Sequence, residues 1–203
     1  ERQAPGRSRY KETFIRLLTS RGFTQGDSFP AKAGISLFHS FLRPVTAAEA
    51  FVRNNDIAVS VLYAVIFVLS FSVGIMRIGQ TSLGAFGEGL LFGAAAFMLI
   101  NALTMVTFRF LLKSRIAFKR FFAAFSLPSF YMSLFILIAS AGRVTQISFF
   151  MTIAAGLAAM VLTHFISLKA MSGQPTERLL VNMILVYFIF LMITGVTAGH
   201  AVI

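Results

Sequence analysis

The chain has 203 residues, of which 57% are hydrophobic and only 12% charged, and its mean hydropathy is +0.82. Soluble globular domains carry about 25% charged residues, so this composition excludes a soluble domain and predicts an integral membrane protein. The formal net charge is +11, but the basic residues gather in an N-terminal segment and one short turn, which favours anionic lipid head groups over nucleic acid as a partner. The absence of cysteine excludes disulfides and thiolate metal sites.

Residues 1–56 form a basic segment that we expect on the cytoplasmic side. It holds nine basic side chains against five acidic ones. An apolar run at 35–42 is stopped before Pro44, because proline disfavours helical geometry in the residue that precedes it. Thr46 and Glu49 then have the spacing of a capping box, in which each side chain satisfies a free backbone N–H of a new helix. We therefore expect two short amphipathic helices along the membrane surface, joined at Pro44.

Five apolar stretches follow, each long enough at ~1.5 Å per residue to cross a hydrocarbon core of ~30 Å. The predicted spans are residues 57–75, 89–108, 121–141, 147–168 and 179–202. Pro175 and Glu177 predict the start of the last helix, because proline fits a first helical turn and acidic residues favour it. The predicted fold is an all-α bundle of five transmembrane helices, with the N-terminus cytoplasmic and the C-terminus outside.

The loop charges fix this orientation. Segments assigned to the cytoplasmic side contain sixteen Lys and Arg residues, whereas the outer loops contain only Arg77 and Arg143. Short loops rich in Lys and Arg stay in the cytoplasm during insertion. Adding or removing one span would destroy this asymmetry, so the charges favour five spans.

The turn between the second and third spans, from Arg109 to Arg120, has five basic and no acidic side chains. Each Lys or Arg close to a negatively charged leaflet contributes ~1 kcal/mol of attraction. The turn serves either as an insertion signal alone or also as a contact for anionic lipid. The candidate lipid-binding residues are Arg109, Lys113, Arg115, Lys119 and Arg120.

Few polar groups lie within the predicted spans. We interpret Asn101 and Asn182 as partners in hydrogen bonds between helices, which polar residues in spans commonly form. Pro128 predicts a kink in the third span, since proline frees a backbone carbonyl, and Ser126 and Ser129 are candidates to satisfy that carbonyl.

The remaining ionisable residues fit ordinary structural roles. We interpret Glu88 as a solvated residue at a helix start, and His164 and His200 as interfacial residues at opposite membrane faces. The two histidines are then too far apart to share a metal. No motif for phosphate binding, hydrolysis or metal binding is present, and we expect no catalytic, cofactor-binding or metal site.

Small residues recur at helical spacing in two spans and favour close helix packing. They are Gly89, Gly93 and Ala94–Ala96 in the second span, and Ala154, Ala155, Gly156, Ala158 and Ala159 in the fourth.

Residues 37–200 resemble the Yip1-domain family, particularly its bacterial branch. The resemblance rests on five spans with a cytoplasmic N-terminus, on the segment FHSFLRP (38–44) before the first span, and on FKRFFAAFSLP (118–128) leading into the third. It implies a polytopic protein that acts through partners. Eukaryotic members engage small GTPases in vesicle traffic, and some bacterial members accompany transporter or envelope-stress systems. The resemblance assigns no functional residues.

The sequence favours a non-enzymatic membrane scaffold or accessory subunit in a bacterial inner membrane. Its expected partners are phospholipid and other integral membrane proteins or further copies of the chain. A transporter or channel component and a lipid-handling protein remain alternatives. The first requires a polar path, which would have to form at an oligomeric interface. The second would use the basic inner surface and a groove near Pro128.

Overall fold

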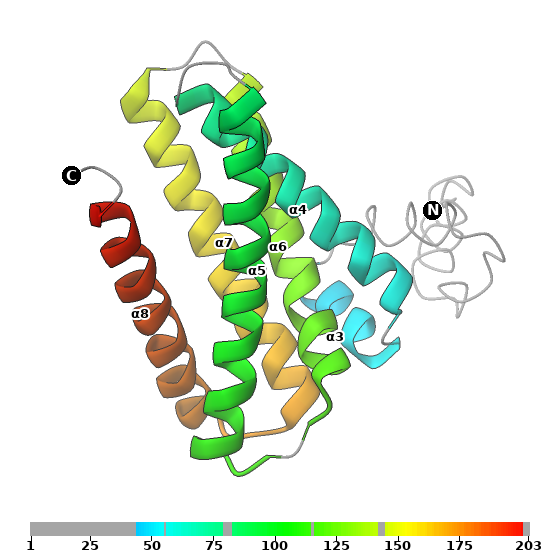
Figure 1. Ribbon diagram of the computed structural model, residues 1–203. Coiled ribbons are helices and arrows are strands. Elements are labelled where there is room, and N and C mark those ends of the chain that lie inside the picture. Colours follow the sequence, from blue (N-terminus) through cyan, green and yellow to red (C-terminus); the bar gives the residue numbers. More distant parts are fainter. Residues whose placement is uncertain (1–43, 55, 79–82, 115, 142–144, 201–203) are drawn as a thin grey trace, which may run out of the picture.

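The computed structural model describes residues 44–54, 56–78, 83–114, 116–141 and 145–200. These residues form six helices and no strand: α3 (Pro44–Asn54), α4 (Ile57–Ile78), α5 (Leu83–Leu111), α6 (Phe118–Ala141), α7 (Gln146–Ser172) and α8 (Thr176–His200). The helices α4 to α8 are each long and apolar enough to cross a membrane, as the sequence predicts. The turn between α5 and α6 and the turn between α7 and α8 lie at the same end of the bundle (Figure 1). The predicted helix at 35–42 lies outside the described residues.

Two predicted helix starts are wrong and one is confirmed. Thr46 does not cap α3, because this helix already begins at Pro44, and proline fits the first helical turn, where its missing N–H is not needed. Glu88 is exposed but lies more than one turn inside α5, which begins at Leu83. By contrast, α8 begins at Thr176 and has Glu177 in its first turn.

Both ends of α7 are closed by side-chain or backbone hydrogen bonds. Thr145 Oγ1 accepts a hydrogen bond from the backbone N–H of Ser148. Gly173 adopts a left-handed backbone with φ of 62°, and its N–H donates to the carbonyl of Lys169 at 3.1 Å. Glycine takes this conformation without the steric strain that a Cβ would bring. The chain can therefore turn sharply into α8.

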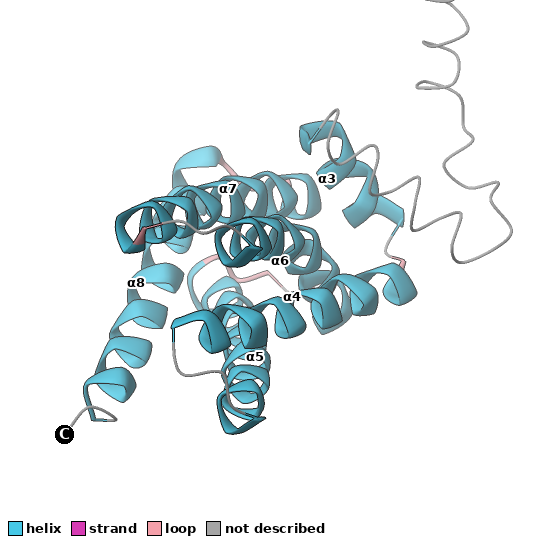
Figure 2. Ribbon diagram, turned by 90° about the horizontal axis from the view of Figure 1, so that it is seen from above, coloured by secondary structure: helices cyan, strands magenta, loops and turns pink. Residues whose placement is uncertain are grey.

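The helix α6 is the centre of the bundle. It packs along α7 and α4, and it also contacts α3 and α5. Figure 2 shows it enclosed between these helices. Small side chains on α6 permit this many neighbours, because Ala123, Ala124, Ser126, Ser129 and Ser133 are all fully buried and let other helices approach closely.

Glycines set the closest helix contacts. A Cβ at Gly89 would lie 2.4 Å from Ser72 Cα, and one at Gly93 would lie 2.9 Å from Phe71 Cβ, so α5 meets α4 almost backbone to backbone. A Cβ at Gly156 of α7 would lie 2.5 Å from Phe135 Cβ of α6. The predicted close packing is thus confirmed for these glycines. It is wrong for the neighbouring Ala94, Ala95, Ala154, Ala155 and Ala158, which are exposed on the outside of the bundle.

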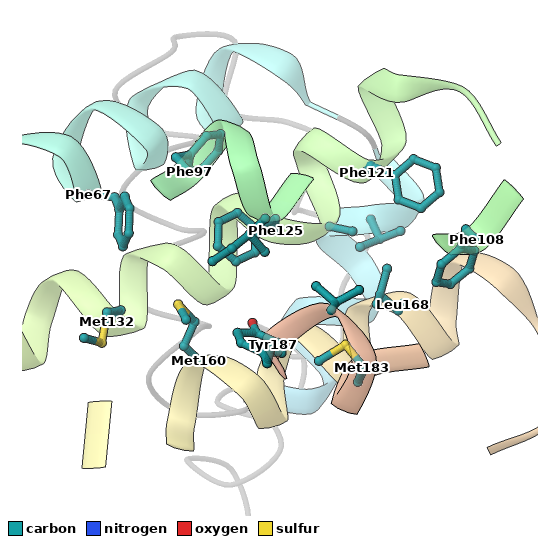
Figure 3. Close-up of a cluster of buried hydrophobic side chains, with 14 of the residues drawn as sticks. Phe67, Phe97, Phe108, Phe121, Phe125, Met132, Met160, Leu168, Met183 and Tyr187 are labelled. Atoms are coloured by element: carbon teal, nitrogen blue, oxygen red, sulfur yellow. The ribbon is translucent and has the colours of Figure 1, made fainter. Parts of the chain in front are cut away.

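Phenylalanine rings fill the core. Phe125 of α6 lies 6.4 Å from Phe67 of α4 and 5.2 Å from Phe97 of α5, measured between ring centroids. Phe108 and Phe121 form an edge-to-face pair at 5.2 Å (Figure 3). This pair adjoins the turn at residues 109–120, called the basic turn below. In a membrane, where the surrounding lipid is as apolar as these rings, van der Waals packing rather than escape from water would stabilise this core.

The short helix α3 packs against the bundle through its apolar face. It contacts α6 and α7, with Ala48, Phe51 and Val52 buried. The ring of Phe51 stacks on Tyr63 at 5.5 Å, and Tyr63 stacks on Phe130 at 4.8 Å. These ring contacts thus link α3 to α4 and to the central helix α6.

Candidate functional site

The basic turn is built by the end of α5, a short connection and the start of α6. Backbone N–H groups of Leu112 and Ser114 both donate to the carbonyl of Phe108, at 3.2 and 3.3 Å. Between them, Lys113 adopts a left-handed backbone with φ of 49°, which is uncommon for a residue with a Cβ. These contacts fold the connection tightly against the end of α5 and hold the Lys113 backbone in place.

A hollow of about 740 Å³ lies at this turn. It is lined by Arg109, Lys113, Ser114, Ile116 and Ala117. Both cationic side chains are exposed, and the remaining lining is small, polar or apolar. The hollow therefore combines positive charge with an apolar wall, which suits an anionic and partly apolar ligand.

The other basic candidates lie beside the hollow or outside the described residues. Lys119 and Arg120 are exposed on the first turn of α6. Arg115 is not among the described residues. Apolar side chains are exposed next to the cations: Phe110 is 79% exposed, and Leu111 and Phe118 are also exposed.

The two asparagines are fully buried, but neither makes the expected hydrogen bond between helices. Asn101 Nδ2 donates to the carbonyl of Phe97 in its own helix, at 2.8 Å. Asn101 Oδ1 and both side-chain polar atoms of Asn182 have no hydrogen-bond partner among the described residues. Among the described residues, neither asparagine makes the interhelical hydrogen bond that the sequence predicts.

The structure instead joins α7 and α8 through a pair that the sequence analysis missed. His164 Nδ1 lies 3.1 Å from the hydroxyl oxygen of Tyr187, and both side chains are buried. The His164 ring also meets Phe125 edge to face at 5.0 Å. His164 is thus a core residue rather than an interfacial one. His164 follows Gly156 and Met160 at intervals of four residues, which places all three on one face of α7. This spacing could have indicated that His164 is buried.

Pro128 is buried in α6, so it faces the other helices of the bundle. The neighbouring hydroxyls do not serve the carbonyl that it frees, which is that of Ala124. Ser126 Oγ donates to the Ala123 carbonyl at 2.9 Å, and Ser129 Oγ donates to the Ser126 carbonyl at 2.7 Å. Each hydroxyl has one proton to donate, so the predicted role of the two serines is wrong.

A second, apolar hollow of about 150 Å³ lies between α4, α6 and α7. Its lining residue Met132 lies one helical turn after Pro128 in α6. Its wall includes Phe71, Gly74, Met132, Ile136 and Phe150. It contains none of the candidate residues named from the sequence.

Among the described residues, no group of three or more His, Asp or Glu side chains is placed to hold a metal ion. Comparisons with protein-family models, curated proteins and solved structures give no match for this chain.

Proposed function

We propose that the protein is a non-enzymatic membrane scaffold or accessory subunit that binds other integral membrane proteins through its outer helix faces. The proposal places it in a bacterial inner membrane and extends the resemblance to the bacterial Yip1-domain family. The observation that supports it most is that the helices contribute unequally to the packing of the core. The core is organised around α6, whereas α8 lies at the edge of the bundle and, among the described helices, packs mainly on α5 and α7 (Figure 2).

The outer face of α8 supports this proposal. Leu180, Ile184, Phe188 and Leu191 are spaced at helical intervals and are each more than half exposed. Such a stripe forms a ridge that fits a groove on another transmembrane helix. Because the opposite face of α8 is buried against its own bundle, partner binding through the ridge requires no rearrangement of the core.

A transport function is less well supported. A transport path needs polar groups that reach water, and the buried polar side chains Asn101, Asn182, His164 and Tyr187 are enclosed by the core. Lipid handling is the second candidate, and the hollow at the basic turn favours it. The groove near Pro128 stays a prediction, and the apolar hollow between α4, α6 and α7 includes Met132, one helical turn from Pro128.

Co-purification in mild detergent, followed by mass spectrometry, tests the scaffold. We expect a stoichiometric integral membrane partner with the wild-type chain. The variant Leu180→Ala/Ile184→Ala shortens the ridge on α8 and should lower partner recovery. Val61→Ala/Val65→Ala is the matched control, because these residues are similarly exposed on α4 at the same spacing. Recovery of wild-type protein with phospholipid alone would reject the scaffold in favour of lipid handling.

A further inference from the structure

We propose that the hollow at the basic turn is a binding site for the phosphate-bearing head group of one anionic phospholipid. Its head group would lie between Arg109 and Lys113, and its acyl chains would run along the exposed rings next to the turn. This inference does not rest on the scaffold proposal, because it concerns a different surface.

The position of the two cations supports a site rather than a diffuse charge. Arg109 belongs to the last turn of α5, and Lys113 lies in a connection whose backbone is tied to Phe108 by two hydrogen bonds. Both residues line one hollow, so they lie close enough to act on one ligand. No acidic residue lies between Arg109 and Arg120 to neutralise them. One Arg guanidinium can donate two parallel hydrogen bonds to two oxygens of a phosphate, and a Lys ammonium adds a positive point charge.

The apolar surroundings identify the ligand as a lipid. Ile116 and Ala117 form part of the hollow, and Phe110 is 79% exposed beside Arg109. An inorganic anion or an acidic peptide would leave these apolar groups uncovered. A phospholipid complements both parts, because its phosphate meets the cations while its chains cover the rings.

The other described turn at the same end of the bundle provides an internal comparison. Lys169 and Arg178 flank the connection between α7 and α8, and both are exposed. Glu177 adjoins Arg178 and reduces the local positive charge. Neither Lys169 nor Arg178 lines the hollow at the basic turn. Equal loss of charge at the two turns should therefore have unequal effects on lipid binding.

Native mass spectrometry tests this difference. The wild-type chain, Arg109→Gln/Lys113→Asn and Lys169→Gln/Arg178→Gln would be reconstituted in mixed phosphatidylglycerol and phosphatidylcholine, then released in mild detergent. Asn is chosen at Lys113 because it tolerates left-handed backbone. Each cation near an anionic lipid favours binding by roughly fivefold, so the first variant should lose about 30-fold in preference for phosphatidylglycerol. The control should retain the wild-type preference.

A fluorescence measurement locates the bound lipid. The chain has no tryptophan, so Phe110→Trp introduces a single reporter beside the hollow, and Phe188→Trp places a matched reporter on the exposed face of α8. Brominated phosphatidylglycerol should quench the first reporter more strongly than brominated phosphatidylcholine does, and Arg109→Gln/Lys113→Asn should abolish the difference. The second reporter should not distinguish the two lipids.

Three outcomes would overturn the proposal. One is equal phosphatidylglycerol retention in the wild type and the hollow variant. Another is an equal loss of phosphatidylglycerol preference in both double variants, which would indicate that the lipid is attracted non-specifically to any basic residue. The third is loss of a co-purifying protein with unchanged lipid retention, which would assign the hollow to an acidic protein partner. Thermal melting of each variant would verify that it is folded.

Discussion

At the residue scale, the buried polar side chains fall into two groups: those that have a hydrogen-bond partner among the described residues and those that do not. Most buried hydroxyls donate to a carbonyl one turn earlier in the same helix, as Thr104 does to Ile100 at 2.7 Å. His164 and Tyr187 satisfy each other across two helices. Within the described part of the chain, the Asn182 side chain has no hydrogen-bond partner, and a buried amide without partners is costly in an apolar medium. This residue therefore opposes the docking of α8.

The first prediction concerns Asn182. Asn182→Leu removes the unsatisfied amide and keeps a side chain of similar size, so it should raise the stability of the folded bundle by about 1–3 kcal/mol. The measurement is thermal melting in detergent. Asn101→Leu is the control and should gain less, because it also removes the hydrogen bond to Phe97. A lower melting temperature for Asn182→Leu would show that the amide has a bonding partner in the folded protein.

The second prediction concerns the pair between α7 and α8. Tyr187→Phe keeps the ring in the core but leaves His164 Nδ1 without its partner, so it should destabilise the bundle. A double-mutant cycle with His164→Leu should give a coupling energy of about 0.6–2 kcal/mol, the range found for hydrogen bonds between transmembrane helices. Additive effects of the two substitutions would mean that the hydrogen bond does not contribute to stability.

At the scale of the element, close approach at glycine determines which helices pair. The spacing of Gly89 and Gly93 places both on one face of α5, and this face meets Val68, Phe71 and Ser72 of α4. Between helices in a lipid bilayer, where no hydrophobic driving force acts, such close contacts would supply much of the attraction. The contact of α5 with α4 should therefore be sensitive to a single methyl group.

The third prediction compares two glycines of α5. Gly89→Ala places a Cβ 2.4 Å from Ser72 Cα, a backbone atom that cannot move aside without shifting α4. It should lower stability by about 1–3 kcal/mol, as overpacking does. Gly87→Ala is the matched control, since nothing lies within 4 Å of a Cβ there. The control variant should have unchanged stability, or be more stable by up to ~1 kcal/mol because alanine has the higher helix propensity. Similar melting of both variants would argue against this helix contact.

The sequence predicts the helices well but not their contacts. Apolar length identifies α4 to α8, because lipid allows few other arrangements of a backbone segment. Burial is harder to predict, because nearly every face of these helices is apolar. The same small-residue pattern that packs at Gly156 leaves Ala154 and Ala155 exposed. His164 was misplaced for a related reason, since its distance from the helix end does not show which way it faces.

The candidate lipid site was also only partly predictable. The run of charge from Arg109 to Arg120 is evident in the sequence. That Arg109 and Lys113 share one hollow, while Lys119 and Arg120 lie beside it on α6, depends on where α5 ends and on the left-handed backbone at Lys113. A lysine carries no sequence signal for that conformation, so the geometry could not be predicted.

At the scale of the whole molecule, the arrangement of the helices agrees with the distribution of charge. The two connections assigned to the cytoplasm lie at one end of the bundle (Figure 1), and that end carries the exposed Arg109, Lys113, Lys169 and Arg178. If all five long helices cross a membrane, the N-terminus and the C-terminus are expected on opposite sides of it. Orientation in a membrane follows from these charges through insertion and can be measured independently of packing.

The last prediction tests this orientation. A reporter enzyme that is active only outside the cytoplasm should be active when fused after Ile203 and inactive when fused after Gln174, because sixteen of eighteen basic residues are assigned to the cytoplasmic side. A reporter that is active only in the cytoplasm serves as the control and should give the opposite pattern at both sites. Activity of the first reporter at Gln174 would show that the predicted five-span topology is inverted or wrong. It would also place the basic hollow at the outer face, and would remove the cytoplasmic leaflet as the source of its lipid.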